Sequence, residues 1–435
     1  MSLFGAMSTA ISGLTAQSSA FSNISDNVAN SQTVGYKEVN TSFIDYLTNS
    51  NAAVNDSASV VARPAYANNV QGTITQSTNT TALAIAGQGF FAISQQIGTV
   101  SGQPSFGAQQ FYTRTGDFQM DKDGYLVNSA SGFLNGWTVT PATGIADQNS
   151  ISPIQVTQTT FSPIATTEVA LAANLPATPA VGTPISSQIN VYDSLGTVHP
   201  VTLDWTQNSA SDWTVTVTSP DDIVSAASGT ANVRFGTISG NPVAPGTIGD
   251  IGTVTGSVAT AGYSAGGAAA ISFITNFGSG PQTINVSFGN FDQTNGVTQY
   301  AGTQYQLSSL TQNGVPPGSF ASVAMQANGE VIVNFNNGQS RTIAQIPIVT
   351  FNNPNGLQSE NGQAFTATVA SGAPTANATS NNGAGTLVTN SVESSNVDIA
   401  AEFSKLIVAQ RAYSANAKMV TTADELLQLT IDLKR

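Results

Sequence analysis

The sequence predicts an α+β protein in which long N- and C-terminal helices form a coiled-coil-like layer, with mainly-β domains nested between them. Three observations support this fold class. Apolar residues recur every seven positions in the first thirty residues, and they do so again in the last forty. Between these regions, short apolar or alternating runs are separated by Asp-Gly and Asn-Gly turn signals.

The first predicted helix carries its apolar stripe at two interleaved heptad positions. Gly5 and Gly13 each lower helix propensity by about 1 kcal/mol relative to alanine, but they would let a neighbouring helix approach closely. Asn30, Ser31 and Gly35 form the expected stop. The stripe consists of Met7, Leu14, Phe21 and Val28, together with Leu3, Ala10, Gln17 and Ile24.

The last predicted helix repeats this pattern. Residues Ser395–Asp398 are typical of a capping box, which predicts that the helix starts there. A matched pair of amphipathic helices suggests that the two chain ends meet in one helical layer. The second stripe consists of Ile399, Leu406, Tyr413, Val420 and Leu427, with Phe403, Gln410, Ala417 and Ile431 at the other heptad position.

The region between the helices is predicted to be β-rich. Trp213–Val217 alternates apolar and polar residues with period two, whereas Val331–Val333 and Ile346–Val349 are short apolar runs. Residues 223–270 are rich in Gly, Ala, Ser and Thr, so we expect loosely specified strands or long loops there.

Four nested parts are expected because both chain ends belong to the helical layer. They are a terminal helical core (1–32 and 395–435), an extended linker (33–71 and 373–394), an inner β domain (72–159 and 299–372) and an outer β domain (160–298). Each domain would then be entered and left once by the chain.

The composition excludes several classes of function. Only 8% of the 435 residues are charged and the net charge is −13, so we expect no nucleic-acid partner. Cysteine is absent and His199 is the single histidine, which excludes thiolate and multi-histidine metal sites. There is no run of about 18 apolar residues, and no basic residue precedes Lys37. We therefore expect neither membrane insertion nor a cleaved signal peptide.

Several short motifs match catalytic or binding patterns only in part. Gly87–Ala92 fits a dinucleotide fingerprint, but no helix or acidic residue follows as required, so a tight turn between strands is expected. Gly262–Gly266 matches a nucleophile elbow, but the single histidine precedes it. Asp117–Asp123 lacks the ligand spacing of a calcium loop, which favours a hairpin. With His199 expected to be structural, we predict no enzyme activity, no cofactor and no metal.

Both ends of the chain carry sequence signatures that resemble those of bacterial flagellar rod and hook proteins. The matching segments are Ser12–Gln17, Ile24–Asn30, Thr33–Lys37, Ser395–Phe403, Ile407–Tyr413 and Ala415–Lys418. The signature residues carried over from this resemblance are Asn27, Ala29, Asn30, Thr33, Gly35, Tyr36, Ser395, Asn396, Val397, Asp398, Gln410 and Arg411.

Interior segments resemble hook proteins in particular, and only residues 223–290 lack such a likeness. The resemblance implies a structural hook subunit that self-assembles into a flexible tube, a universal joint that transmits motor torque from rod to filament. A distal rod or other flagellar axial subunit, or a β-rich surface adhesin, is the alternative interpretation. The segments are Ala84–Phe91, Thr113–Phe118, Tyr192–His199, Gly314–Gly318, Asn336–Gln339 and Phe351–Leu357.

The resemblance also implies a location and a set of partners. The subunit would lie in the hook next to the basal body, outside the cell, after type III export without a cleaved signal peptide. Its partners would be other copies of itself, the distal rod, hook cap and hook–filament junction proteins, and the export apparatus. In this family the terminal helices form the inner tube, and the middle of the chain is outermost.

We expect the two apolar stripes to form the assembly interface, because single helices are marginal in water and a long stripe needs partners. The low-charge outer surface would offer interchangeable hydrogen bonds, so that outer contacts slide while the hook rotates. The candidate interface residues are Leu3, Met7, Leu14, Phe21, Ile24, Val28, Ile399, Phe403, Leu406, Tyr413, Val420, Leu427 and Ile431.

Overall fold

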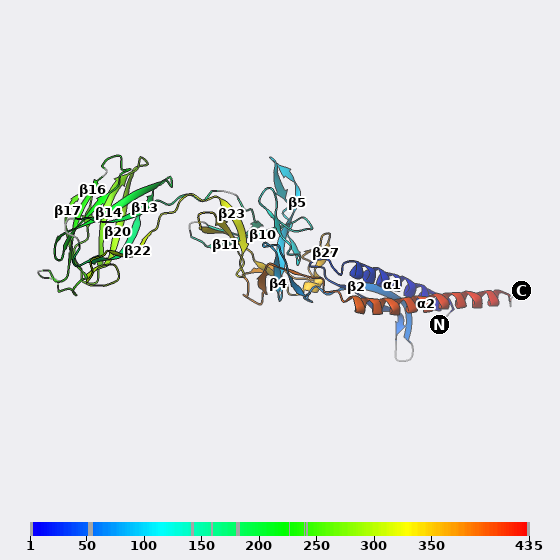
Figure 1. The fold of residues 1–435 in the computed structure, drawn as a ribbon. Coiled ribbons are helices and arrows are strands. Elements are labelled where there is room, and N and C mark those ends of the chain that lie inside the picture. Colours follow the sequence, from blue (N-terminus) through cyan, green and yellow to red (C-terminus); the bar gives the residue numbers. More distant parts are fainter. Residues whose placement is uncertain are drawn as a thin grey trace. The chain divides into compact units, whose positions relative to one another are not determined.

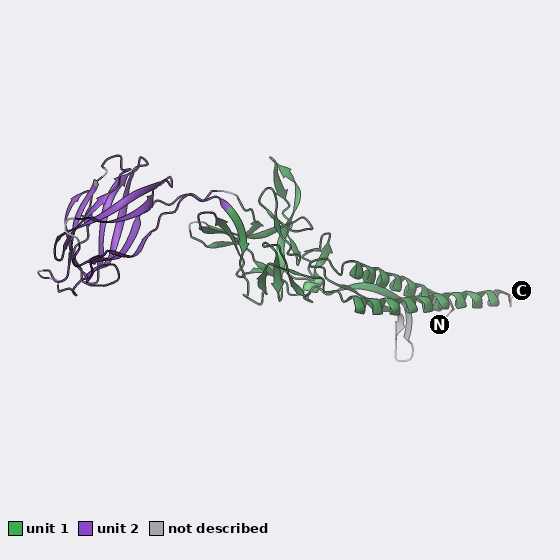
Figure 2. Cartoon of the chain, viewed as in Figure 1, with its two compact units in different colours: residues 1–158, 321–334, 340–435 green, residues 159–320, 335–339 purple. Residues whose placement is uncertain are grey.

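The computed structural model describes residues 3–50, 55–140, 143–157, 160–179, 183–225, 227–238, 240 and 242–432. The chain divides into two compact units (Figure 2). Unit 1 contains residues 1–158, 321–334 and 340–435, and unit 2 contains residues 159–320 and 335–339. Unit 2 is thus an insertion in the sequence of unit 1. The four-part division expected from the sequence stays a prediction.

Two long helices occupy the chain ends, as predicted (Figure 1). They are α1 (Leu3–Ala29) and α2 (Ile399–Asp432). Shortly after α1, Gly35 adopts a φ of +70°, which glycine reaches without strain. A Cβ atom at Gly35 would lie 2.6 Å from the backbone nitrogen of Thr115, so glycine is required where the chain leaves the helix.

A β-hairpin follows α1 and lies against it. Strands β1 (Val39–Ser50) and β2 (Asn55–Tyr66) pair antiparallel. The Val60 N–H donates to Ser12 Oγ at 3.1 Å, and Asn23 Nδ2 donates to Thr41 Oγ1 at 2.8 Å. The 33–71 segment, expected to be an extended linker, therefore contains a paired hairpin that is attached to the helix.

Most of the other strands of unit 1 form a branched sheet. Its strands are β5 (Phe90–Val100), β6 (Gln103–Phe106), β7 (Phe111–Thr113), β8 (Gln119–Met120), β9 (Leu126–Val127), β10 (Gly132–Val139), β11 (Ala146–Pro153), β23 (Phe320–Met325), β24 (Glu330–Phe335), β25 (Ser340–Gln345), β26 (Ile348–Thr350), β27 (Gln358–Glu360), β28 (Ala364–Thr366) and β29 (Thr375–Asn377). The main path runs β23-β24-β25-β10-β5-β7-β28-β27.

Two small sheets in unit 1 join segments that are far apart in the sequence. Strand β3 (Ile74–Gln76) pairs with β31 (Ser391–Glu393), and β4 (Leu83–Ala86) pairs with β30 (Thr386–Thr389). The segment that follows the hairpin is therefore paired with the segment that precedes α2.

Unit 2 consists of two sheets around one core. The five-stranded sheet is antiparallel, in the order β13 (Ile185–Tyr192), β14 (Val198–Ser209), β15 (Asp212–Thr218), β16 (Ala227–Phe235) and β17 (Ile248–Gly256). The six-stranded sheet contains β18 (Ala259–Thr260), β19 (Ala268–Asn276), β20 (Pro281–Asn290), β12 (Glu168–Pro176), β21 (Val297–Tyr300) and β22 (Gln306–Gln312). Trp205, Trp213, Phe273 and Phe288 are fully buried between the sheets.

The predicted alternation of β15 is confirmed, because Trp213, Val215 and Val217 are buried while the residues between them are half-buried. For residues 223–270, where strands or long loops were expected, the structure shows strands at β16 and β17. Both strands contribute to the core of unit 2, with Val233 and Ile251 buried. Pairing with neighbouring strands orders this region, although Gly and Ala have low strand propensity.

The remaining sequence motifs are local structural features. Gly87 and Gly89, with φ of +103° and +124°, form the predicted turn between β4 and β5. Strands β8 and β9 form the expected hairpin around the Asp-Lys-Asp-Gly turn. His199 Nδ1 lies 2.9 Å from Asp221 Oδ2, and its ring stacks on Phe277. Among the described residues, no helix has the length and apolarity to cross a membrane, and no acidic or histidine cluster could hold a metal ion.

Candidate assembly surface

The two terminal helices pack antiparallel through small side chains. Asn27 of α1 meets Glu402 at the start of α2, and Gly13 faces Asn416 further along. A Cβ atom at Gly13 would lie 2.8 Å from Asn416 Nδ2, so this glycine allows the close approach expected from the sequence. Alanines are buried on both helices, Ala10, Ala16 and Ala20 on α1 and Ala409 and Ala423 on α2.

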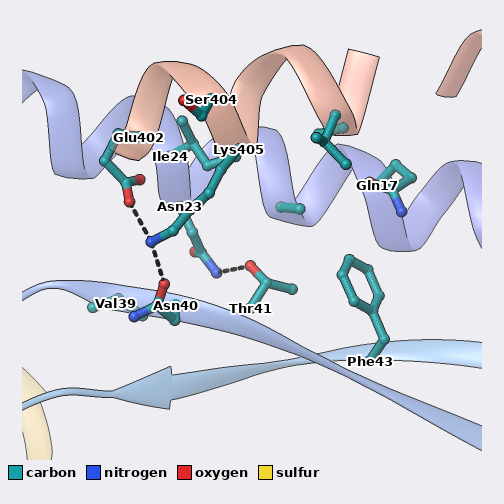
Figure 3. Close-up of a pocket in the computed structure, with 13 residues that line it drawn as sticks. Gln17, Asn23, Ile24, Val39, Asn40, Thr41, Phe43, Glu402, Ser404 and Lys405 are labelled. Atoms are coloured by element: carbon teal, nitrogen blue, oxygen red, sulfur yellow. Dashed lines mark hydrogen bonds and ion pairs between the residues drawn. The ribbon is translucent and has the colours of Figure 1, made fainter. Parts of the chain in front are cut away.

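A groove of about 460 Å³ opens between the helix pair and the hairpin (Figure 3). Its polar edge contains Lys405, whose Nζ lies 2.6 Å from both Glu38 Oε1 and Asn40 Oδ1 and 2.5 Å from Glu402 Oε1. The apolar part contains Ala20, Ile24, Val39, Phe43, Val408 and Ala409. The groove therefore combines apolar walls with one cation that is already paired with carboxylates.

Asn27 is a central polar contact of the helix layer. Its side-chain amide donates to the Val39 carbonyl at 3.0 Å and to Glu402 Oε2 at 3.1 Å. Its Oδ1 accepts from the Tyr36 hydroxyl at 3.1 Å and from the Val39 N–H at 3.0 Å. One buried side chain thus joins α1, the segment before the hairpin, and α2.

Replacing Asn27 by alanine is expected to reduce the free energy of unfolding of unit 1 by about 2–3 kcal/mol, because buried partners lose their hydrogen bonds. Urea unfolding followed by circular dichroism measures the change. Asn30→Ala is the matched control, since Asn30 donates only locally to the Asp26 carbonyl at 2.9 Å. Its cost should stay below about 1 kcal/mol, and equal losses for the two variants would contradict the role of Asn27.

Burial raises the pKa of Tyr36 from 10.0 to about 12, and the carboxylates of Asp26, Glu402 and Glu38 add to the shift. The neutral phenol is therefore favoured in the folded chain. Its contribution to stability should be complete below pH 10 and should be lost as the pH rises toward 12. When phenolate absorbance is followed as the pH is raised, Tyr36→Phe should lack one phenol that ionises above pH 10 in the wild type. Loss of a phenol that titrates at its ordinary pKa would contradict this.

Glu393 forms a buried ionic cluster just before α2. Its carboxylate accepts from Lys37 Nζ at 2.5 Å, Arg114 Nη1 at 2.9 Å and the Gly72 N–H at 2.8 Å. The three charged side chains are almost completely buried. Burial lowers the pKa of Lys37, and Glu393 partly offsets this effect. The cluster joins three distant segments of unit 1, and sequence reasoning did not identify Glu393.

The start of α2 differs from the prediction. The helix begins at Ile399, and the N-cap is Asp398, whose Oδ1 accepts from the N–H groups of Ala400 at 2.8 Å and Ala401 at 3.2 Å. The capping box proposed for Ser395–Asp398 is therefore wrong, because Ser395 Oγ accepts only from Val397, before the helix. An aspartate that can reach the free N–H groups of the first turn displaces the serine as the cap.

Asn396 connects this entry segment to the start of the hairpin. Its Oδ1 accepts from the Glu38 N–H at 2.7 Å, and its Nδ2 donates to the carbonyls of Ala67 and Val70. Other signature residues have local or exposed positions. Thr33 Oγ1 donates to Asn30 Oδ1, whereas Ala29, Gln410 and Arg411 are exposed.

The predicted interface residues divide into three groups by exposure. Ile24 is buried inside the chain, and Ile399, Phe403 and Tyr413 are exposed. The side chains of Leu3 and Ile431 lie outside the described residues. The half-buried group contains Met7, Leu14, Phe21, Val28, Leu406, Val420 and Leu427. Their role between subunits stays a prediction, whereas within the chain this side of α2 faces α1.

Sequence reasoning missed a second apolar stripe on α2. The side chains of Val408, Met419 and Leu429, all on α2, are 67%, 58% and 59% exposed. The signal was present as a second alternation of three- and four-residue steps, out of phase with the first. The helix layer therefore buries one side of α2 and exposes another.

Family comparisons agree along most of the chain. Residues 7–37 match the model described as Flagella basal body rod protein, and residues 84–162 match Flagellar hook protein FlgE/F/G D1 domain. Residues 162–315 match Flagellar basal body protein FlaE D2 domain, and residues 388–433 match Flagellar basal body rod FlgEFG protein C-terminal. The matches include both terminal signatures and the insertion that forms most of unit 2.

Full-length relatives are flagellar hook proteins. The flagellar hook protein FlgE of Brucella suis biovar 1 is 31% identical over 442 residues, which is 100% of both chains. The Escherichia coli K12 hook protein FlgE is 29% identical over 99% of this chain and 100% of its own. The crystal structure of Helicobacter pylori flagellar hook protein FlgE2 aligns with a TM-score of 0.46 and 13% identity, over 72% of this chain and 98% of that one. On the full-length sequence relationship, this chain belongs to the bacterial flagellar hook protein family and is a structural subunit of the hook.

Proposed function

We propose that this hook subunit polymerises with copies of itself into the flexible tube that transmits torque from rod to filament. The proposal rests on the apolar side of α2 that the single chain leaves exposed, at Val408, Met419 and Leu429. Burying each such side chain contributes about 1.5–3 kcal/mol, so association through the terminal helices is strongly favoured. In the tube, these helices form a coiled-coil layer.

Flexibility is assigned to the outer part of the chain, the region around residues 160–298. This region contains a single basic residue, Arg234, so contacts between neighbouring outer domains would consist mainly of hydrogen bonds between short polar side chains. Such bonds exchange partners at little net cost in free energy. The outer contacts would slide during rotation while the helical layer keeps the subunits connected.

Family membership supports the further partners and the location. We propose contacts with the distal rod, hook cap and hook–filament junction proteins, and passage through the flagellar type III export apparatus without a cleaved signal peptide. The subunit would then reside outside the cell, next to the basal body.

The purified full-length chain is expected to assemble into curved tubes of uniform width, visible by electron microscopy. A strain that lacks the protein should retain the rod but have no hook, and supplying the chain should restore the hook. Normal hooks in the deletion strain, with only attachment lost, would support a surface adhesin instead. A shortened rod would indicate a rod subunit.

Removing the outer domain should preserve tube assembly and change curvature or stiffness. The structure places suitable ends at Phe161 and Gly318, whose backbones are hydrogen-bonded to each other at 2.7 and 3.2 Å. Since β21 and β22 share a sheet with β12, the deletion should span residues 162–315. Electron microscopy of the tubes measures their curvature. A shortened chain that stays folded but no longer polymerises would contradict the assignment of assembly to the helices.

A further inference from the structure

The exposed stripe of α2 has the spacing of a coiled-coil seam. Its members alternate steps of four and three residues over three heptads, which is the pattern that packs against another helix in a left-handed crossing. Val408, Met419 and Leu429 are its most exposed large side chains. The full stripe, called the outer α2 stripe below, is Val408, Ala412, Ala415, Met419, Thr422, Leu426 and Leu429.

Helix α1 presents an exposed stripe with the same spacing. It lies on the side of α1 opposite to Ala10, Ala20 and Ile24, which are buried inside the chain. Apart from Ile11, its side chains are small and carry hydroxyl groups, so they leave room for larger side chains from a partner. This outer α1 stripe consists of Ser8, Ile11, Thr15, Ser18, Ser22 and Ser25, all of which are exposed.

We propose that the outer α2 stripe of one subunit packs on the outer α1 stripe of a second copy of this chain. The inference rests on the proposed self-assembly and names the surfaces that carry it. A stripe that paired with itself would form an isologous contact, which closes into a two-fold dimer, whereas an open tube requires two different surfaces. Within the described residues, the chain has two α-helices, so the helical surface that differs from the outer α2 stripe is on α1.

Charge and size both favour this pairing. Asp26, the sole charged residue of α1, flanks the outer α1 stripe. Arg411, Lys418 and Glu425 lie along one edge of the outer α2 stripe and are exposed, so this edge keeps a net positive charge that complements the negative charge of Asp26. The large α2 side chains would face mostly small residues on α1, with Ile11 as the exception, an arrangement that lets two helices interdigitate closely.

The groove continues the outer α2 stripe. Val408, the first residue of the stripe, also lines the groove, next to the half-exposed ring of Phe43 on β1. A helix that lies along the stripe would thus extend over the groove and cover apolar surface there. Asn23 and Thr41 of the groove offer polar partners for hydroxyl groups of the incoming helix, whereas Lys405 is already paired with Glu38 and Glu402.

Disulfide trapping tests the pairing directly, because the natural chain has no cysteine. Met419→Cys is combined in turn with Ser8→Cys, Thr15→Cys, Ser18→Cys or Ser22→Cys, which scans the register along α1. Tubes are assembled from each full-length variant, oxidised, and run on non-reducing gels. Thr421→Cys replaces Met419→Cys in the control set, since two residues further along a helix is nearly the opposite side.

At least one Met419 pair should give a ladder of dimers, trimers and higher oligomers, whereas the Thr421 controls should not. Dimers from Met419→Cys alone would show that α2 pairs with α2, and would overturn the proposal. Assembled tubes without cross-links across the whole panel would also overturn it. If the wild-type chain forms no tubes, the proposed function fails first, and the pairing fails with it.

A charge substitution provides an independent measurement. Met419→Glu should abolish tube formation, whereas Thr421→Glu should assemble like wild type. Circular dichroism of the two monomeric variants should match wild type, which separates lost assembly from lost folding. Normal tubes from Met419→Glu would overturn the proposal.

Discussion

Replacing Glu393 by glutamine is expected to reduce the free energy of unfolding of unit 1 by about 3–5 kcal/mol. The variant keeps the shape of the side chain but leaves Lys37 and Arg114 as buried cations without an anion. Removing one partner of a buried ion cluster is costly because the other charges stay out of water. Since the cluster joins three segments, the loss should affect unit 1 as a whole.

Tryptophan fluorescence can report this loss for unit 1 separately. Trp137 is buried in unit 1, whereas Trp205 and Trp213, the other two tryptophans, are buried in unit 2. Urea unfolding of Glu393→Gln is therefore compared with its parent in a chain that carries Trp205→Phe and Trp213→Phe. Glu425→Gln, at an exposed carboxylate of unit 1, should change stability by less than about 0.5 kcal/mol. An equally small effect at Glu393 would mean that the ionic cluster makes no net contribution to the stability of unit 1.

Trp205→Ala is expected to destabilise unit 2 by about 3–5 kcal/mol, because it removes a fully buried indole and leaves a cavity. The ring contacts Phe288 edge-to-face, with centroids 5.2 Å apart. Its Nε1 has no hydrogen-bond partner among the described residues, so the expected loss is attributed to packing. The urea concentration at which unit 1 unfolds should not change, because the two units have separate cores.

The fluorescence of Trp213 measures unit 2 in a chain that carries Trp137→Phe, and far-UV circular dichroism follows the helices of unit 1. Ile223→Ala is the control, since this residue of unit 2 is exposed and its loss should cost less than about 0.5 kcal/mol. A single transition in which both signals move together would contradict two independently stable units.

Periodicity in the sequence was sufficient to predict both terminal helices and the β-rich region between them. A seven-residue apolar repeat has few alternatives to a helix, and alternation such as that of Trp213–Val217 has few alternatives to a strand. For the weakly patterned residues 223–270 the sequence left strands and long loops as alternatives, because pairing with neighbouring strands, and not local sequence, orders β16 and β17.

The polar contacts could be predicted only in part. Asn27 and Asn396 were identified by resemblance to a family, without their partners. Glu393 and Arg114 lie 279 positions apart in the sequence, and no local pattern shows that two such groups meet. The cap of α2 was misplaced because Ser395 and Asp398 are both good caps, and backbone geometry decides which of them reaches the free N–H groups.

The sequence alone determined that the chain ends are amphipathic helices, that the middle is β-structured and low in charge, and that the chain resembles hook proteins. Tertiary structure alone decided which side of each helix is used within the chain. A heptad stripe shows that a helix has a partner, but it does not show whether that partner lies in the same chain or in another copy. Small residues such as Gly13 and Ala409 allow α1 and α2 to pack closely on one side. The larger side chains of Val408 and Met419 are thereby left exposed on the other side.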